Sequence, residues 1–211
     1  MLKVIPRFIA FLVVLFLVPA LAFAGDNDWH LSAKGDRAFF LRSVFAHGYM
    51  HGYEQGFHQG DLDLQMGHAF VRIKNQKEYK KVQGYRRDFG DHISFNEGYR
   101  KGYAVGYRDA YAGRNFRAAE LIELAKSQDL RGTEAGPDGG FDQAFVSGYS
   151  LGQKMGLMDG RAAAPLANLN SIHCSGVSGK ENCTAFQCGY RIGYSDGYTD
   201  QNGKRTVLAR K

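Results

Sequence analysis

The sequence lacks the short signatures that mark common catalytic sites. It contains no Gly-x-Ser-x-Gly turn, no phosphate-binding P-loop, no His-Glu-x-x-His pair, and no cysteine and histidine in the context of a nucleophile. β-Branched residues are also scarce in its repeated segments, which disfavours strands. The first absence argues against an enzyme, and the second argues for helices.

Long apolar runs are missing after residue 24. Within residues 1–24, Lys3 and Arg7 precede an apolar stretch at 8–18, and an Ala-Phe-Ala tripeptide stands directly before Gly25. This pattern is typical of a secretory signal peptide, and the stretch is shorter than the about 20 apolar residues of a membrane anchor. We therefore predict cleavage before Gly25, an exported protein that is periplasmic or secreted, and no transmembrane span in the mature chain.

Acidic residues are scarce in one stretch of an otherwise mixed chain. The formal charge is +6, and residues 72–87 hold seven basic side chains against Glu78 alone. A solvent-exposed helix face explains this stretch, and a basic tail is predicted at 204–211. The alternative is contact with an anionic envelope surface, such as phospholipid headgroups, lipopolysaccharide or cell-wall polymer. Nucleic acid is not expected as the partner of an exported protein.

Cysteine occurs three times, at Cys174, Cys183 and Cys188. In an oxidising compartment this number predicts one disulfide and one remaining thiol. Cys183 and Cys188 are five residues apart in an expected helix, about 140° around its axis, so they are poorly placed to bond each other. We therefore expect Cys174 to pair with one of the other two. A zinc site at His173 and Cys174 is disfavoured because no known zinc spacing matches.

Glycine, in contrast, is abundant, and it recurs at every fourth position with tyrosine beside it. One unit occurs in four copies, of which the second reads FNEGYRKGYAVGYRDA. In every copy a phenylalanine stands three residues before the first glycine, and a tyrosine follows that glycine. The copies begin at Phe45, Phe95, Phe145 and Phe186. In the last three copies an aspartate stands eleven residues after the first glycine, at Asp109, Asp159 and Asp200.

The spacing of four residues fits a helix and is also a multiple of the strand repeat. Arg, Lys, Ala, Glu, Gln, Met and Ser fill the variable positions, and these residue types favour a helix. Residues 116–128 have a helical pattern as well. We therefore predict an all-α fold in which four Gly/Tyr-rich repeat helices pack closely, with connecting helices and loops. Residues 25–203 are expected to form one domain, and a Gly/Tyr-rich coil is the alternative.

Glycine inside a helix is unfavourable, so its repetition needs a compensating gain. Fourteen glycines occupy these positions, and at about 0.8 to 1.0 kcal/mol each relative to alanine they cost on the order of 11 to 14 kcal/mol. A row of glycines forms a groove that lets a second helix approach closely, with tyrosines buried along its edge. The predicted helix-packing residues are Gly48, Gly52, Gly56, Gly98, Gly102, Gly106, Gly148, Gly152, Gly156, Gly189, Gly193 and Gly197.

This glycine spacing resembles the motifs of two known groups of proteins. The repeats are similar to the glycine-every-fourth-residue helix of eukaryotic cytosolic adaptor proteins in iron-sulfur protein maturation, and to glycine zippers in general. The segment GYRIGYSDG at 189–197, with Cys188 before it, resembles the Gly-Tyr-x-x-Gly-x-x-Asp-small helix of the Tai family of periplasmic immunity proteins. Both resemblances imply a helical binding protein without catalytic activity.

Histidine is concentrated on one face of the first copy. His47, His51, Glu54 and His58 project within a narrow arc opposite the glycines, so we expect them to face solvent or a partner. Histidines four residues apart on a helix can ligate Zn or Cu, which makes these residues a candidate metal site. The other copies have different residue types at these positions, which favours a solvated face and no cofactor.

These patterns predict a binding or structural module of the cell envelope that acts through a protein partner or through self-association. The alternative is a periplasmic protein that binds a transition metal through the histidines of the first copy. The repeated aspartates are expected to form hydrogen bonds at helix ends or between helices, because a calcium loop needs more closely spaced oxygen ligands.

Overall fold

The computed structural model describes residues 39–117, 139–169, 171–174 and 176–209, with side chains up to residue 200. The predicted signal peptide and most of the predicted helix at 116–128 lie outside the described residues. Within the described ranges every regular element is a helix, which confirms the predicted all-α fold. None of the described helices combines the length and the apolar composition that crossing a membrane requires.

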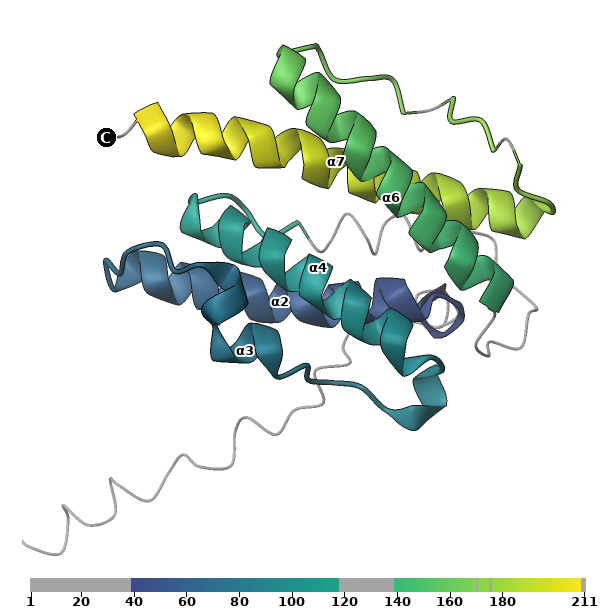
Figure 1. The fold of residues 1–211 in the computed structure, drawn as a ribbon, viewed down its shortest axis with the longest axis horizontal. Helices are drawn as coiled ribbons and strands as arrows, with labels where there is room; N and C mark the ends of the chain where they lie inside the picture. The colour runs from purple at the N-terminus through teal and green to yellow at the C-terminus, as the bar shows by residue number, and fades with distance from the viewer. Residues whose placement is uncertain (1–38, 118–138, 170, 175, 210–211) are drawn as a thin grey trace, which may run out of the picture.

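Four long helices contain one copy of the repeat each (Figure 1). They are α2 (Val44–Gln65), α4 (His92–Tyr111), α6 (Gly139–Ala162) and α7 (Lys180–Ala209). Three short turns lie between α2 and α4, namely η3 (Ile73–Asn75), α3 (Lys77–Lys80) and η4 (Arg87–Phe89). Helix α7 includes the backbone of residues 204–209, for which the sequence predicted a separate tail.

Polar caps set where the first two long helices begin. Ser43 caps α2, and its side chain accepts a hydrogen bond from the backbone N–H of Ala46. Asp91 caps α4, and its carboxylate accepts hydrogen bonds from the backbone N–H groups of Ile93 and Ser94. Such caps satisfy amide groups that the first turn of a helix leaves without partners. The repeats in α2 and α4 therefore start from defined points in the chain.

The long helices form two pairs, α2 with α4 and α6 with α7 (Figure 1). Gly48 of α2 lies against Phe95 of α4, and Gly60 lies against Tyr107, so the two helices of the first pair run in the same direction. The helices of the second pair are parallel in the same way. Parallel neighbours need a connection that returns along their whole length, which explains why each pair contains a long connecting segment.

Within each pair the two backbones touch at the glycines. A Cβ atom on Gly102 would lie 2.0 Å from the carbonyl oxygen of Tyr49, and one on Gly193 would lie 2.1 Å from that of Tyr149. At all twelve predicted packing glycines, the added Cβ would lie 1.9 to 2.2 Å from a carbonyl oxygen of the partner helix. Even alanine does not fit there unless a helix moves, and Cα–H···O contacts are typical of helices this close.

Tyrosines spaced by four residues, most of them directly after a glycine, form stacked columns on the second helix of each pair. The column on α4 consists of Tyr99, Tyr103, Tyr107 and Tyr111, with successive ring centroids 6.0 to 6.5 Å apart. The column on α7 consists of Tyr190, Tyr194 and Tyr198, with centroids 6.1 to 6.3 Å apart. Spacing of four residues along a helix places these rings above one another.

The phenol groups of these columns hold the connecting segments of the two pairs. From α4, Tyr111 donates a hydrogen bond to the carbonyl oxygen of His68 at 2.9 Å. From α7, Tyr198 donates to the carbonyl oxygen of Ala164 at 2.9 Å. We refer to residues 66–91 as the first connector and to residues 163–179 as the second. Each connector is therefore fixed to the helix that follows it.

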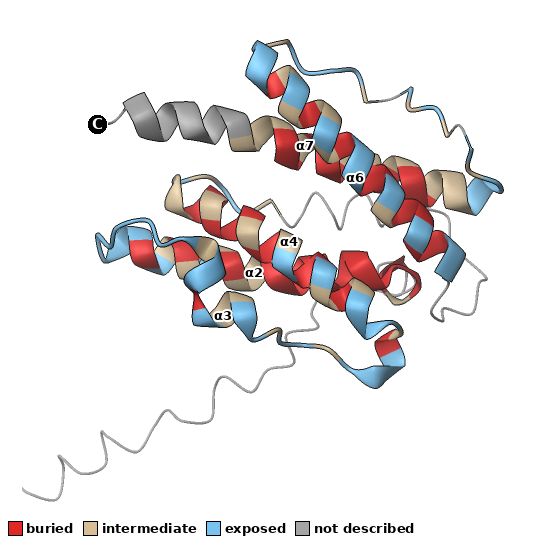
Figure 2. Ribbon diagram, viewed as in Figure 1, coloured by how far each residue is buried: buried red, intermediate tan, exposed pale blue. Residues whose placement is uncertain are grey.

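The two pairs meet through aromatic side chains of α2 and α6. Phe45 packs against Phe145 with ring centroids 6.0 Å apart, and Tyr49 packs against Tyr149 at 5.8 Å. Near the same place Asp142 of α6 accepts a hydrogen bond from the backbone N–H of Phe45 at 2.9 Å. Figure 2 shows buried residues along the faces that the helices turn toward one another. The interior is therefore built mainly from tyrosine and phenylalanine.

The disulfide joins Cys174 of the second connector to Cys183 of α7. This confirms that Cys174 pairs with one of the two later cysteines. Cys188 is a buried thiol on the same helix, and burial raises its pKa to about 11. Its thiol is therefore protonated at neutral pH and poorly reactive.

Candidate functional site

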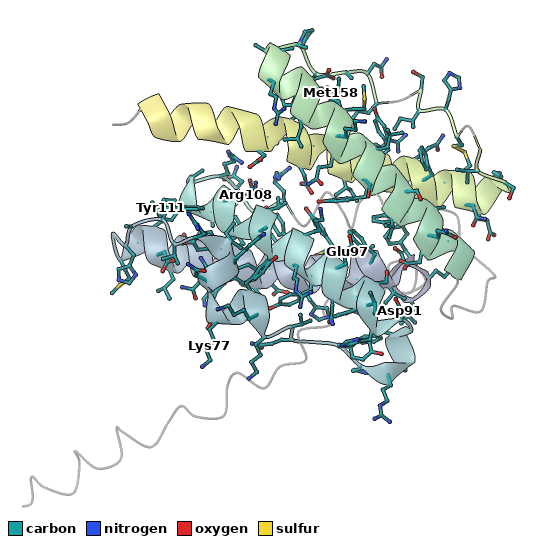
Figure 3. All side chains as sticks on the ribbon, in the orientation of Figure 1. Lys77, Asp91, Glu97, Arg108, Tyr111 and Met158 are labelled. Atoms are coloured by element: carbon teal, nitrogen blue, oxygen red, sulfur yellow. A yellow bond between two sulfur atoms is a disulfide. The ribbon has the colours of Figure 1, made fainter. Side chains whose placement is uncertain are left out.

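A cleft of about 750 Å³ lies where the C-terminal part of α4 approaches α7. Its walls come from residues 70–74 of the first connector, from residues 105–117, and from α7. In Figure 3, Arg108 and Tyr111 mark this end of α4, and Arg108 lies on the side that faces α7. Clefts of this volume are typical of small-molecule sites.

Charged side chains make up most of the polar lining of the cleft. The basic residues are Arg72, Lys74, Arg108, Arg114 and Arg117. The acidic residues are Asp109, Asp196 and Asp200. The basic residues outnumber the acidic ones, so the lining of the cleft has an excess of positive charge.

Asp109 of α4 is a buried carboxylate with several donors around it. Arg114 donates to its Oδ1 atom at 2.6 Å, and Nε and Nη2 of Arg117 donate to its Oδ2 atom at 2.9 and 2.7 Å. Tyr53 of α2 donates to the same Oδ2 atom at 3.0 Å. Asp109 thus fixes the position of two arginines that follow α4, and it ties them to both helices of the first pair.

Asp196 of α7 is the second buried carboxylate of the cleft. Tyr49 and Tyr149 donate to its Oδ2 atom at 2.8 and 2.9 Å, and Nη2 of Arg117 lies 3.5 Å from its Oδ1 atom. Burial raises the pKa of Asp196 to about 6, although Arg117 and the two phenols oppose that rise. This single carboxylate joins α7 to α2 and to α6.

Arg117 bridges the two buried carboxylates. Its Nη1 atom also donates to the hydroxyl of Ser195 at 2.8 Å, next to Asp196 on α7. Burial by itself would lower the pKa of this guanidinium, but Asp196 and Asp109 together raise it above its usual value. Arg117 therefore keeps its charge, and it fastens the segment after α4 to the second helix pair.

The apolar part of the cleft comes from the first connector and the end of α4. Phe70 packs edge-on against Tyr107 and Tyr111, with ring centroids 5.3 and 5.2 Å apart. The backbone N–H of Val71 donates to the hydroxyl of Tyr107 at 3.3 Å. The tyrosine column of α4 therefore positions this apolar wall. The side chain of Phe70 is nevertheless 48% exposed to solvent.

The structure contradicts the prediction that the histidine face of α2 is open. His47 is fully buried, and His51 is only 7% exposed. The ring of His47 lies 4.1 Å from the ring of Phe89, and Gly84 lies against the ring of His51. The first connector covers the part of this face that contains His47 and His51. The residue pattern of α2 by itself contains no information about a distant segment that folds back over it.

The four candidate metal ligands do not come together as one site. The Nε2 atoms of His47 and His51 are 3.2 Å apart, whereas His58 is exposed farther along α2. His51, Glu54 and His58 line a second hollow of about 590 Å³. In the part of the chain that the structure describes, no group of three or more His, Cys, Asp or Glu side chains is arranged to hold a metal ion.

The repeated aspartates make interhelix bonds, as predicted from their positions. Asp109 accepts from Tyr53, and Asp159 of α6 accepts from Tyr194 of α7 at 2.7 Å. Asp200 of α7 accepts from Arg108 of α4. All three aspartates therefore link elements that are distant in the sequence.

The sequence did not predict that Asp196 and Arg117 help to connect the two pairs at the cleft, although Asp196 is the aspartate of the segment GYRIGYSDG. Asp196 is not a repeated position, because the second copy has Val105 at the equivalent place, three residues after a packing glycine. The resemblance of residues 189–197 to the Tai helix was the available signal, because its motif contains this aspartate. Arg117 lies beyond the repeat, and nothing in its local sequence distinguishes it from a solvent-exposed arginine.

Comparisons with known proteins assign no family to this arrangement. No protein-family model, curated protein or solved structure matches the chain. The similarity of the glycine spacing to adaptor helices and to the Tai family stays a prediction. A function is therefore inferred from the chemistry of the cleft residues.

Proposed function

We propose that this chain is an exported binding protein of the cell envelope, without catalytic activity, and that its ligand occupies the cleft between the two helix pairs. The cleft itself is the observation that carries the proposal. Its volume of about 750 Å³ suits a small molecule or a short segment of a partner. Its lining combines an apolar wall, on which Phe70 is exposed, with five basic and three acidic side chains. Apolar surface beside convergent polar groups is typical of a binding site.

The state of the buried carboxylates favours binding over catalysis. A general base must offer an accessible oxygen to the proton that it removes. Asp109 is 1% exposed and accepts hydrogen bonds from two arginines and a tyrosine, and Asp196 is 5% exposed and accepts from two tyrosines. These carboxylates act as fixed supports for the arginines of the cleft.

The metal-binding alternative loses support from the positions of the histidines. His47 is buried beneath the first connector, so it cannot join His58 around one ion without displacing that connector. The basic stretch of the sequence, in contrast, reaches the proposed site. Two of its residues, Arg72 and Lys74, line the cleft.

A dye-binding experiment with the exported protein tests this function. The probes are N-phenyl-1-naphthylamine, which is neutral, and 1-anilinonaphthalene-8-sulfonate, which carries one negative charge. We expect at least one dye to bind saturably with micromolar affinity. Ala112→Trp places a large ring inside the cleft and should weaken that binding at least tenfold. Ala162→Trp, at the exposed end of α6, is the matched control and should change it less than twofold.

Two results would contradict the proposal. The first is the absence of saturable binding of either dye. The second is an equal loss of affinity in both tryptophan variants, because dye binding would then not depend on the space inside the cleft. Thermal unfolding of each variant establishes that the chain is folded under the conditions of the titration.

A further inference from the structure

The charges inside the cleft are unevenly paired. Three of the five basic residues have acidic partners, since Arg108 bonds to Asp200 and both Arg114 and Arg117 bond to Asp109. The side chains of Arg72 and Lys74 have no ion pair or hydrogen bond with any described residue, and both are exposed. The uncompensated positive charge therefore lies at one place, on the wall formed by η3.

An apolar surface lies directly beside these two charges. Ile73 stands between Arg72 and Lys74 in the chain and lines the same cleft. Phe70 and Tyr111 continue this surface, and their rings are in edge-on contact. A ligand that covers this surface would be stabilised by about 25 cal/mol per Å² of apolar area that it buries.

We propose that the ligand is an amphipathic anion with one acidic group and an apolar body. This inference rests on the proposed function, because it takes the cleft to be the binding site. Arg72 and Lys74 bind the carboxylate, sulfonate or phosphate at the mouth. The apolar body packs against Phe70, Ile73 and Tyr111. The arginines deeper in the cleft are already paired with carboxylates, so a second acidic group would gain little there.

The rest of the basic stretch is placed to attract such a ligand rather than to hold it. Lys77 projects from α3 on the side of the first pair that faces away from α7 (Figure 3). Lys80 and Lys81 are exposed in the same segment and do not line the cleft. Clustered charges of one sign raise the local concentration of opposite charges. Removing Lys80 and Lys81 therefore tests general electrostatics without touching the proposed contacts.

The two dyes test the inference directly, because they share an apolar body and differ in the sulfonate. We expect 1-anilinonaphthalene-8-sulfonate to bind at least tenfold more tightly than the neutral dye. In the double variant Arg72→Glu with Lys74→Glu, affinity for the anionic dye should fall at least tenfold, and affinity for the neutral dye should change less than twofold. The matched control, Lys80→Glu with Lys81→Glu, makes the same charge change and should weaken the anionic dye less than threefold.

Displacement of the anionic dye identifies the source of the acidic group. Vesicles of anionic phospholipid and a soluble fatty acid are added in separate titrations, with neutral phospholipid vesicles and the matching fatty alcohol as controls. Displacement by the anionic vesicles assigns the acidic group to a membrane lipid, and displacement by the fatty acid alone assigns it to a soluble amphiphile. Either result supports the proposal.

Other results overturn the inference and leave the proposed function intact. Equal affinities for the two dyes, or equal displacement by the fatty acid and its alcohol, would show that the cleft does not select an acidic group. An equal loss of affinity in the two double variants would show that Arg72 and Lys74 make no specific contact. Failure of the Ala112→Trp experiment, in contrast, would remove the cleft as a site altogether.

Discussion

In the first helix pair, the segment that returns the chain contains three short helical turns and lies on the tyrosine column of α4. In the second pair, the returning segment has no regular helix among its described residues and is joined to α7 by the Cys174–Cys183 disulfide. The glycine contacts are the same in both pairs, with the added Cβ 1.9 to 2.2 Å from a carbonyl oxygen at all twelve packing glycines. The packing of the helices and the tyrosine hydrogen bonds to each connector are therefore repeated, whereas the described residues contain a disulfide only in the second pair.

The cleft is lined largely by residues that are not the same in the two pairs. Val105 of α4 and Asp196 of α7 each stand three residues after a packing glycine, and both line the cleft. One is apolar and the other is a buried carboxylate that accepts hydrogen bonds from two tyrosines. Glycines and tyrosines thus provide a duplicated frame. The residues between the glycines and tyrosines differ between the pairs, as Val105 and Asp196 do. Together with the first connector, they provide the charged and apolar side chains of the cleft.

The largest expected effect comes from filling a glycine contact in either pair. Gly102→Leu in α4 and Gly193→Leu in α7 both force a side chain into the backbone of the partner helix. Because a carbonyl group cannot rotate away as a side chain can, each should destabilise the protein by about 3 kcal/mol or more. For a chain of this size the melting temperature should fall by about 6 to 12 °C. Thermal unfolding of the two variants measures whether the pairs are equally sensitive.

Gly139→Ala provides the matched control for these substitutions. Gly139 is the first residue of α6, and a Cβ there would meet nothing within 4 Å. This variant should therefore be neutral or slightly stabilising, since alanine favours a helix more than glycine does. A melting temperature for Gly102→Leu as high as that of Gly139→Ala would show that the first pair does not need its backbone contact.

The sequence contains the information for the helices and for their contact surfaces. A glycine at every fourth position fixes both the helical period and the face that approaches a partner, so residues such as Gly48 and Gly102 could be assigned to packing. Cys174 could be assigned to the disulfide because only it stands outside the helix of the other two. These features depend on spacing along the chain, which the sequence records directly.

The parallel direction of the helices and the cleft could not be predicted in the same way. Direction depends on how the connectors run, and connectors as long as 66–91 and 163–179 permit either arrangement. The wrong expectation for His47 and His51 has the same origin, because Phe89 covers their face from a segment that is distant in the sequence. Asp196 and Arg117 meet only after both pairs have formed, so the local sequence around each residue could not show that they connect the pairs.

Reduction of the disulfide should destabilise the second pair by about 2 to 3 kcal/mol. Cys174 and Cys183 are 9 residues apart, and closing a loop of that length lowers the entropy of the unfolded chain by roughly this amount. The second connector should then show faster amide hydrogen exchange, and the first connector should not, since the disulfide joins only the second connector to its helix. Exchange measured with and without reductant tests this, and equal acceleration in both connectors would contradict it.

Asp196 should give the free energy of unfolding a slope between about pH 4 and pH 6. Its pKa is raised to about 6 by burial, above its usual value of about 3.9, so in this window the native state holds a proton that the unfolded chain has released. The free energy of unfolding therefore falls as pH rises from about 4 to 6, by on the order of 1 to 3 kcal/mol. Above pH 6 this contribution is constant.

Urea unfolding of the native protein and of Asp196→Asn, at several pH values from 4 to 7, isolates this contribution. Asp142, whose pKa is raised by burial, and Asp63, whose pKa is lowered because hydrogen bonds outweigh burial, affect both proteins and cancel in the difference. The stability difference between the two proteins should change across the window. A constant difference would show that Asp196 releases its proton at the same pH in the folded and unfolded chains.

The smallest expected effects come from removing single tyrosine hydroxyl groups. Each of these variants should affect one connector and leave the other unchanged. Tyr103 of α4 donates to the side chain of Gln76, and the hydroxyl of Tyr194 of α7 accepts from the backbone N–H of Ala167 at 3.1 Å. Replacing either tyrosine by phenylalanine removes the hydroxyl group and keeps the stacked ring. Tyr103→Phe should destabilise the protein by about 1 kcal/mol, and Tyr194→Phe by about 1 to 2 kcal/mol, since it also loses the hydrogen bond to Asp159. Tyr103→Phe should accelerate hydrogen exchange only in the first connector, and Tyr194→Phe only in the second. If either variant accelerated exchange equally in both connectors, the two segments would open together. The pairs would then differ in the side chains of their connectors and not in the local stability of those connectors.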